Sequence, residues 1–218
     1  MLILALLDRE HLDNGPFLKS LSVAVSRLKG VRILFMHSDS DYTDRVMQLG
    51  IMRDVALNRS TRELNRRLSA LFTEEGSTCV GLNGFQKDCL VLSEGSLMVD
   101  SGYLTQILSH SHVILSNMVA DRDSGDTGFA EPARMAADLQ VALKPDHFIV
   151  FSMKEDGSPI IENENSGSGH IFRADDELIS TLIPAEIRDS GTDFLVTSLR
   201  QFASLPDVSG MLKVIAEV

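Results

Sequence analysis

The chain has 218 residues, of which 44% are hydrophobic and 23% are charged, and its formal net charge is −11. This length and composition fit one folded domain around a single core, and they argue against a disordered chain. The acidic excess argues against nucleic acid or an anionic lipid surface as a partner, and it opposes ATP binding unless a local pocket reverses the field.

The N-terminal sequence MLILALLDREH begins with a short apolar run that leads directly into charged residues. The run is too short to span a membrane and lacks the basic start of a signal peptide, so we predict a first strand and expect a cytoplasmic protein. Cys79 and Cys89 belong to no CxxC pair and to no Cys/His set with metal-ligand spacing. They are predicted to be reduced thiols, and no metal site is expected.

Apolar runs alternate with segments of helical periodicity along the chain. The runs predict strands at 2–7, 31–36, 78–82, 113–115, 147–151 and 212–215. The periodic segments predict helices at 15–28, 41–50, 61–72 and 132–143. This alternation favours an α/β fold in which a largely parallel sheet is covered on both faces.

Two segments interrupt the alternation, because turn residues separate short strand-like pieces at 91–100 and 114–126. These pieces predict β-hairpins that project from the sheet. The polar, glycine-rich segment 162–170 predicts a surface loop. Neither an internal repeat nor a long linker occurs, so residues 1–218 are predicted to form a single domain.

Several short motifs occur in a recognisable order: MQLGI after the second predicted helix, Arg59 in NRST, CVGLNG at 79–84, and later VILSNMVADRDSGDTG and FIVFSM. In this order the chain resembles acetylglutamate kinase, of the amino-acid kinase family. The resemblance implies a three-layer αβα sandwich with a mostly parallel central sheet. It also implies a homodimer that pairs through its amino-terminal half.

The chain departs from that family where the first two strands end. The family places a lysine and a glycine pair after the first strand, whereas this chain has Asp8. After the second strand the family has a histidine and three glycines that approach the substrate. Here His37 is followed by Ser38, Asp39 and Ser40, which the resemblance makes candidate substrate-binding residues. Their side chains and negative charge disfavour a close approach of backbone to phosphate.

The nucleotide side of the family site is also altered. The family's Asn-Ala-Asp motif falls on residues 132–134, with Glu131 as the acidic substitute in a shifted register. The aspartate that organises the family's catalytic lysines falls on Met153. By resemblance, Glu131, Arg134 and Lys154 are the candidate nucleotide-binding residues.

The family's Gly-Gly-Met motif and its catalytic lysine can be placed in two registers. The preferred register is SGTDFLVT at 190–197, where no lysine occurs. The alternative is SGMLK at 209–213, which supplies Lys213 but ends the chain before the family's last strand.

The chain thus lacks the family's lysine after the first strand and, in the preferred register, its catalytic lysine. These two positive charges are the main groups that stabilise a transferring phosphoryl group. We therefore predict a diverged acetylglutamate kinase-like protein, weak or inactive as a kinase. It would bind a small carboxylate through Arg59, or a partner subunit such as an active kinase paralogue. An active kinase would instead use Mg-ATP, with Arg134, Lys154 or Lys213 as substitute residues.

A second enzyme class also fits one motif. DSDYT at 39–43 follows the apolar run RILFMH and resembles the signature of haloacid-dehalogenase-type phosphatases. In such an enzyme Asp39 is the nucleophile, Asp41 the acid, Ser152 the phosphate-binding residue, and Asp175 with Asp176 the magnesium ligands.

The same residues also have purely structural interpretations. Asp39 and Asp41 are suited to capping the next helix, and capping is the favoured role of Asp41. His37 at a strand end is typical of a hydrogen-bonded core or rim histidine. Arg59 is equally typical of a surface arginine at a helix start.

Overall fold

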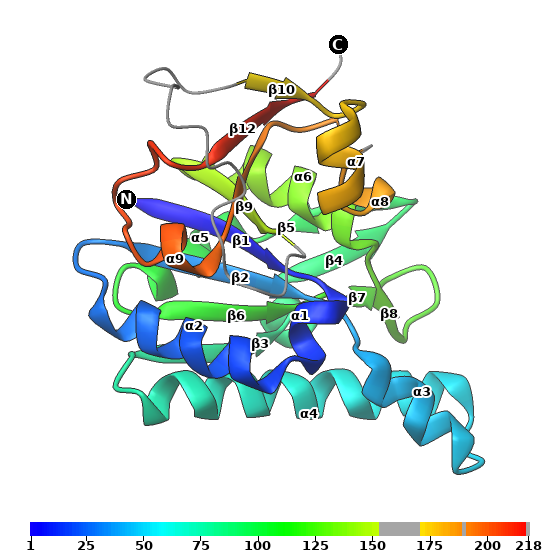
Figure 1. Cartoon of the computed structure of the whole chain (residues 1–218). Coiled ribbons are helices and arrows are strands. Elements are labelled where there is room, and N and C mark those ends of the chain that lie inside the picture. The colour runs from blue at the N-terminus through cyan, green and yellow to red at the C-terminus, as the bar shows by residue number, and fades with distance from the viewer. Residues whose placement is uncertain (153–170, 189–190, 217–218) are drawn as a thin grey trace.

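The computed structural model describes residues 1–152, 171–188 and 191–216, and its centre is an eight-stranded sheet (Figure 1). The strand order is β10-β12-β11-β9-β1-β2-β6-β3, and all strands are parallel except β10 and β12. The strands are β1 (Leu2–Leu7), β2 (Arg32–His37), β3 (Cys79–Asn83), β6 (His112–Ser116), β9 (His147–Phe151), β10 (Ile171–Arg173), β11 (Phe194–Thr197) and β12 (Leu212–Ile215).

The predicted strands are all present, and three have the predicted bounds. Two further strands, β10 and β11, were not predicted. The segment that forms β11 had been interpreted as a catalytic motif, yet it pairs in parallel with β9 inside the sheet. The predicted loop 162–170 lies outside the described residues, as do Met153 and Lys154.

Helices cover both faces of the sheet, which confirms the three-layer α/β architecture (Figure 1). The helices are α1 (Arg9–Asp13), α2 (Gly15–Arg27), α3 (Asp41–Gln48), α4 (Arg53–Glu74), the 3₁₀ helix η1 (Gln86–Asp88), α5 (Ser101–Leu108), α6 (Pro132–Leu143), α7 (Glu177–Leu182), α8 (Ala185–Arg188) and α9 (Leu199–Phe202).

Helix α4 has 22 residues and is longer than the predicted 61–72 segment. Its first turns bury Ala56, Ser60 and Thr61, which are small or polar and therefore invisible to a search for apolar periodicity. As a consequence, Arg59 lies inside the helix in its second turn and not at a helix start.

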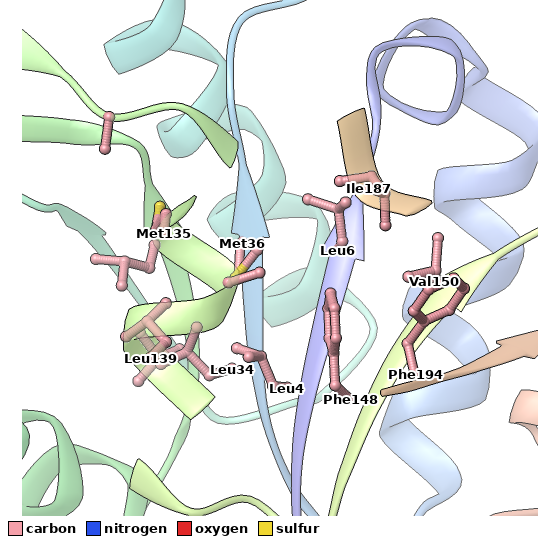
Figure 2. Close-up of a cluster of buried hydrophobic side chains, with 14 of the residues drawn as sticks. Leu4, Leu6, Leu34, Met36, Met135, Leu139, Phe148, Val150, Ile187 and Phe194 are labelled. Atoms are coloured by element: carbon pink, nitrogen blue, oxygen red, sulfur yellow. The ribbon is translucent and has the colours of Figure 1, made fainter. Parts of the chain in front are cut away.

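Strand β1 divides the core into two halves, because successive side chains of a strand point to opposite faces. Ile3, Ala5 and Leu7 pack on the face covered by α2, α4 and α9. Leu4 and Leu6 pack on the other face, where α6 contributes apolar side chains (Figure 2). Two-sided burial explains why β1 is apolar at every position.

A second, four-stranded sheet has the order β5-β4-β7-β8 and contains the predicted hairpins. Its strands are β4 (Leu90–Ser93), β5 (Ser96–Val99), β7 (Met118–Asp121) and β8 (Thr127–Phe129). The prediction for 114–126 was wrong at its start, since residues 114–116 belong to β6 in the central sheet. The β4–β5 turn uses Glu94 and Gly95 with φ of 50° and 70°, as a two-residue hairpin turn requires.

Candidate functional site

The carboxyl ends of β1, β2, β6 and β9 meet at one edge of the central sheet, because these strands are parallel. Ligands of open α/β sheets bind in the crevice beyond this edge. We call it the carboxyl edge.

At the end of β1, Asp8 forms a closed hydrogen-bonded unit with His11. The Asp8 carboxylate accepts a hydrogen bond from the backbone N–H of His11 at 3.1 Å, and its Oδ1 lies 2.5 Å from Nδ1 of the ring. The other ring nitrogen lies 3.3 Å from the carbonyl oxygen of Ser152. Asp8 Oδ2 is buried and has no hydrogen-bond partner among the described residues. A largely buried carboxylate therefore lies at the end of β1, at the carboxyl edge.

At the end of β2, His37 is a buried structural side chain with 1% of its surface exposed. Its Nδ1 lies 2.8 Å from the carbonyl oxygen of Ser38, and its Nε2 lies 3.0 Å from Nδ2 of Asn65 in α4. Burial lowers the pKa of His37 to about 4, so the ring is neutral near pH 7. This geometry agrees with the structural interpretation of His37.

The N-cap of α3 is Ser40, whose hydroxyl accepts a hydrogen bond from the backbone N–H of Tyr42 at 3.3 Å. The favoured capping role of Asp41 was therefore wrong, because Asp41 is the first residue inside the helix. An acidic residue there still interacts favourably with the positive end of the helix dipole.

Arg9 is surrounded by carboxylates at this edge. Its Nε lies 2.6 Å from Asp41 Oδ1, and its Nη2 is paired with Asp44. Burial lowers the pKa of Arg9, but Asp39, Asp44 and Asp41 outweigh this effect and raise it above its ordinary value. The guanidinium is thus already neutralised by the protein, and the carboxyl edge is acidic at its centre.

A separate cleft of about 760 Å³ lies between the first turns of α4 and strand β8. We call it the α4–β8 cleft. Its charged and polar lining residues are Asp54, Asn58, Arg59, Arg62, Asp126 and Thr127, and Phe129 adds an aromatic wall.

Arg62 is the most constrained cation of the α4–β8 cleft. Its guanidinium carbon lies 4.8 Å from the ring centroid of Phe85, which holds the side chain by a cation–π contact. Its Nε is buried without a hydrogen-bond partner among the described residues. Arg59, three residues earlier on the same helix, is exposed. An unsatisfied donor on a fixed guanidinium is suited to a carboxylate ligand.

From the sequence, Arg59 was a candidate ligand-binding residue, whereas Arg62 was not. The sequence did contain a signal for Arg62, because residues three apart on a helix are neighbours on its surface, and Arg62 is three residues after Arg59. The structure brings Arg59 into the α4–β8 cleft but does not place any of residues 37–40 in the cleft lining. Ser40 instead lines a second groove along α4, together with Arg66 and Arg67.

The candidate nucleotide-binding residues lie on separate elements. Glu131 is exposed at the N-cap of α6 and makes no capping hydrogen bond with its side chain. Arg134 is exposed in the first turn of α6, and its Nε lies 3.6 Å from Asp138 Oδ2. Lys213 is exposed in the middle of β12, two strands away from β9. Lys154 lies outside the described residues.

The structure contradicts the phosphatase arrangement. Asp175 and Asp176 follow β10, which runs antiparallel to β2, so they lie at the opposite edge of the sheet from Asp39. Asp176 accepts a hydrogen bond from the backbone N–H of Arg173 at 2.7 Å. Among the described residues, no group of three His, Cys, Asp or Glu side chains is placed to hold a metal ion.

Fold and site together define the class: the chain has the amino-acid kinase fold, and the carboxyl edge of its sheet carries the carboxylates of Asp8 and Asp39. An N-acetylglutamate synthase from Neisseria gonorrhoeae, crystallised with coenzyme A and N-acetylglutamate, matches 100% of this chain and 60% of its own length with TM-score 0.65 and 15% identity. An isopentenyl phosphate kinase matches over 100% of both chains with TM-score 0.65 and 10% identity.

An aspartate kinase from Synechocystis matches 100% of this chain with TM-score 0.68 and 13% identity, over 40% of its own length. The chain thus spans well under two thirds of the synthase and of the aspartate kinase. No protein-family model and no protein of curated function matches the sequence. None of the helices in the described part of the chain is both long enough and apolar enough to cross a bilayer.

Proposed function

We propose that this protein is a diverged member of the amino-acid kinase fold that binds a small carboxylate in the α4–β8 cleft and is weak or inactive as a kinase. The observation that carries the proposal is Arg62, whose buried Nε has no partner among the described residues although it lines the cleft beside Arg59. A bidentate carboxylate would satisfy such a guanidinium.

The acids of the cleft limit the kind of carboxylate that fits. Asp54 and Asp126 line the same space as the two arginines, so the charges of the lining cancel. An acylated amino acid combines a carboxylate with an amide N–H donor. Its carboxylate can pair with the arginines of the cleft, and its N–H can donate a hydrogen bond to an aspartate. N-acetylglutamate, which is bound in the structurally similar synthase, has this chemistry.

The carboxyl edge supports the second half of the proposal. Phosphoryl transfer depends on neutralising charge that spreads over the phosphate oxygens. Asp8 and Asp39 add negative charge at this edge, and Arg9 is already paired with Asp41 and Asp44. ATP phosphates would therefore meet repulsion there instead of a cationic cradle.

Isothermal titration calorimetry with N-acetylglutamate and short dicarboxylates, then with Mg-ATP, tests the proposal. We expect carboxylate binding and no detectable heat with Mg-ATP. Arg62→Ala should weaken carboxylate binding at least about tenfold, since a charged hydrogen-bonding pair is lost. Arg66→Ala is the matched control, because Arg66 is an exposed arginine of the same helix that lines the other groove.

Carboxylate affinity that is unchanged in both Arg59→Ala and Arg62→Ala would contradict the binding site. Micromolar binding of Mg-ATP together with transfer of its terminal phosphate to an acylated amino acid would contradict the loss of kinase activity. The predicted pairing through the amino-terminal half stays a prediction.

A further inference from the structure

The amino ends of β2, β3 and β6 meet at the edge of the sheet opposite to the carboxyl edge. A hollow of about 160 Å³ lies there, and we call it the amino-edge pocket. Its polar lining includes Arg32, Ser77, Thr78, His110 and His112, and none of the lining residues is acidic. In a chain with a net charge of −11, a pocket that holds an arginine and no carboxylate is an exception.

His112 supplies a donor in a fixed orientation. The residue is 6% exposed, and its Nδ1 accepts a hydrogen bond from the backbone N–H of Ile33 at 3.2 Å. The neutral ring therefore carries its hydrogen on Nε2, which has no hydrogen-bond partner in the described part of the chain. Burial and the charge of Arg32 lower the pKa of His112 to about 4, so the ring is neutral near pH 7.

Ser77 supplies a second unused group. The residue is 7% exposed, and its hydroxyl is buried without a hydrogen-bond partner among the described residues. A buried hydroxyl that leaves its hydrogen bond unmade costs about 1–3 kcal/mol, so such groups normally have a protein, water or ligand partner. Ser77 lines the amino-edge pocket, so its hydroxyl is an unsatisfied polar group beside the pocket.

Arg32 supplies the charge. The side chain of Arg32 makes one hydrogen bond with described residues, from Nη1 to the carbonyl oxygen of Val31 at 3.4 Å, near the limit for such a bond. It forms no ion pair with any carboxylate in residues 1–152, 171–188 or 191–216. Most of its fork of donors thus remains free for an anion.

We propose that the amino-edge pocket binds a tetrahedral phosphate group, held by Arg32, His112 Nε2–H and the hydroxyl of Ser77. The volume is too small for a nucleotide, since pockets for drug-sized ligands measure roughly 300–1,000 Å³. The bound group is therefore free phosphate or the phosphate end of a small monoester. This site lies at the edge of the sheet opposite to the carboxyl edge and is independent of the α4–β8 cleft.

Calorimetric titration with inorganic phosphate and with glycerol 3-phosphate at constant ionic strength tests this site. We expect Arg32→Ala to weaken phosphate binding at least about tenfold and Ser77→Ala about threefold, the losses typical of one charged and one neutral hydrogen bond. Arg27→Ala is the matched control for general charge, because Arg27 is an exposed arginine at the end of α2 outside the pocket lining.

The two ligands also distinguish the two sources of the phosphate group. Tighter binding of glycerol 3-phosphate assigns the pocket to an organic monoester, and tighter binding of inorganic phosphate assigns it to the free ion. Absence of binding by both ligands overturns the proposal, and so does binding that Arg32→Ala leaves unchanged. If Arg32→Ala unfolds the protein, Arg32→Gln replaces it, because it removes the charge and keeps most of the side-chain volume. Phosphate affinity that Arg32→Gln and Ser77→Ala both leave unchanged overturns the proposal.

Discussion

The two edges of the central sheet carry opposite chemistry. At the carboxyl edge, Asp8 and Asp39 stand near Arg9, which is already neutralised by other acids. At the amino edge, Arg32 and His112 face a pocket without a carboxylate. The carboxyl edge is the usual ligand edge of an open α/β sheet, yet here it is the less suitable one for a phosphate. The charged side chains at each edge, and not the direction of the strands alone, therefore decide which edge suits an anion.

The largest expected effect is acid destabilisation through the two buried histidines, one at each edge. The pKa of His37 and of His112 is about 4 in the folded protein, against an ordinary value of 6.5. Between these values the unfolded chain binds more protons, so stability falls as the pH is lowered from 6.5 to 4 and is unaffected above about pH 7.5. Each histidine should contribute on the order of 3 kcal/mol, because a shift of one pKa unit corresponds to about 1.4 kcal/mol.

Urea unfolding across this pH range measures the effect. His37→Gln and His112→Gln should each reduce the slope of the unfolding free energy against pH, whatever their own cost in stability at pH 7. An unchanged slope in His37→Gln would show that folding does not lower the pKa of His37, which would contradict its description as a buried neutral ring.

A smaller effect is expected from Asn65, which joins α4 to the carboxyl edge. Its Nδ2 lies 3.0 Å from His37 Nε2, 3.1 Å from the carbonyl oxygen of Leu82 and 3.0 Å from that of Ile114. Asn65→Ala leaves these buried acceptors without their donor and should cost about 2–3 kcal/mol in urea unfolding.

The control for Asn65→Ala is Asn58→Ala, the same change on the same helix at a half-buried position of the α4–β8 cleft. It should cost no more than about 0.5 kcal/mol. Equal losses in the two variants would mean that Asn65 does not hold the carboxyl edge together.

The smallest effect is expected from Arg9 at the carboxyl edge. The side chains of Arg9, Asp41 and Asp44 are 45%, 67% and 52% exposed, so water and salt screen their pairing. Arg9→Ala should therefore cost less than about 1 kcal/mol, and less again in 1 M salt. Arg53→Ala, at an exposed arginine without an ion pair in the described part of the chain, is the control. If Arg9→Ala lowered the unfolding free energy by more than about 2 kcal/mol, independent of salt, the pairing would not be that of a solvent-exposed ion pair.

The sequence alone determined the class of fold and much of the element order. The bounds of β1, β9 and α6 were predicted because a continuous apolar run and a proline at a helix start are local signals. The resemblance to the amino-acid kinase family was carried by short motifs in order, and the fold confirms it. The departures at Asp8 and at residues 38–40 were likewise readable from the sequence.

Only the tertiary structure decided which residues share a site. The antiparallel direction of β10 separates Asp175 from Asp39, and no local pattern states the direction of an edge strand. The length of α4 rests on buried small and polar residues, so the place of Arg59 and its neighbour Arg62 was not evident. The amino-edge pocket joins Arg32, Ser77 and His112 across three strand starts. The hydrophobic periodicity of a segment indicates which of its own faces is buried. A pocket depends on the register and direction of segments that are distant in the chain, which no local pattern contains.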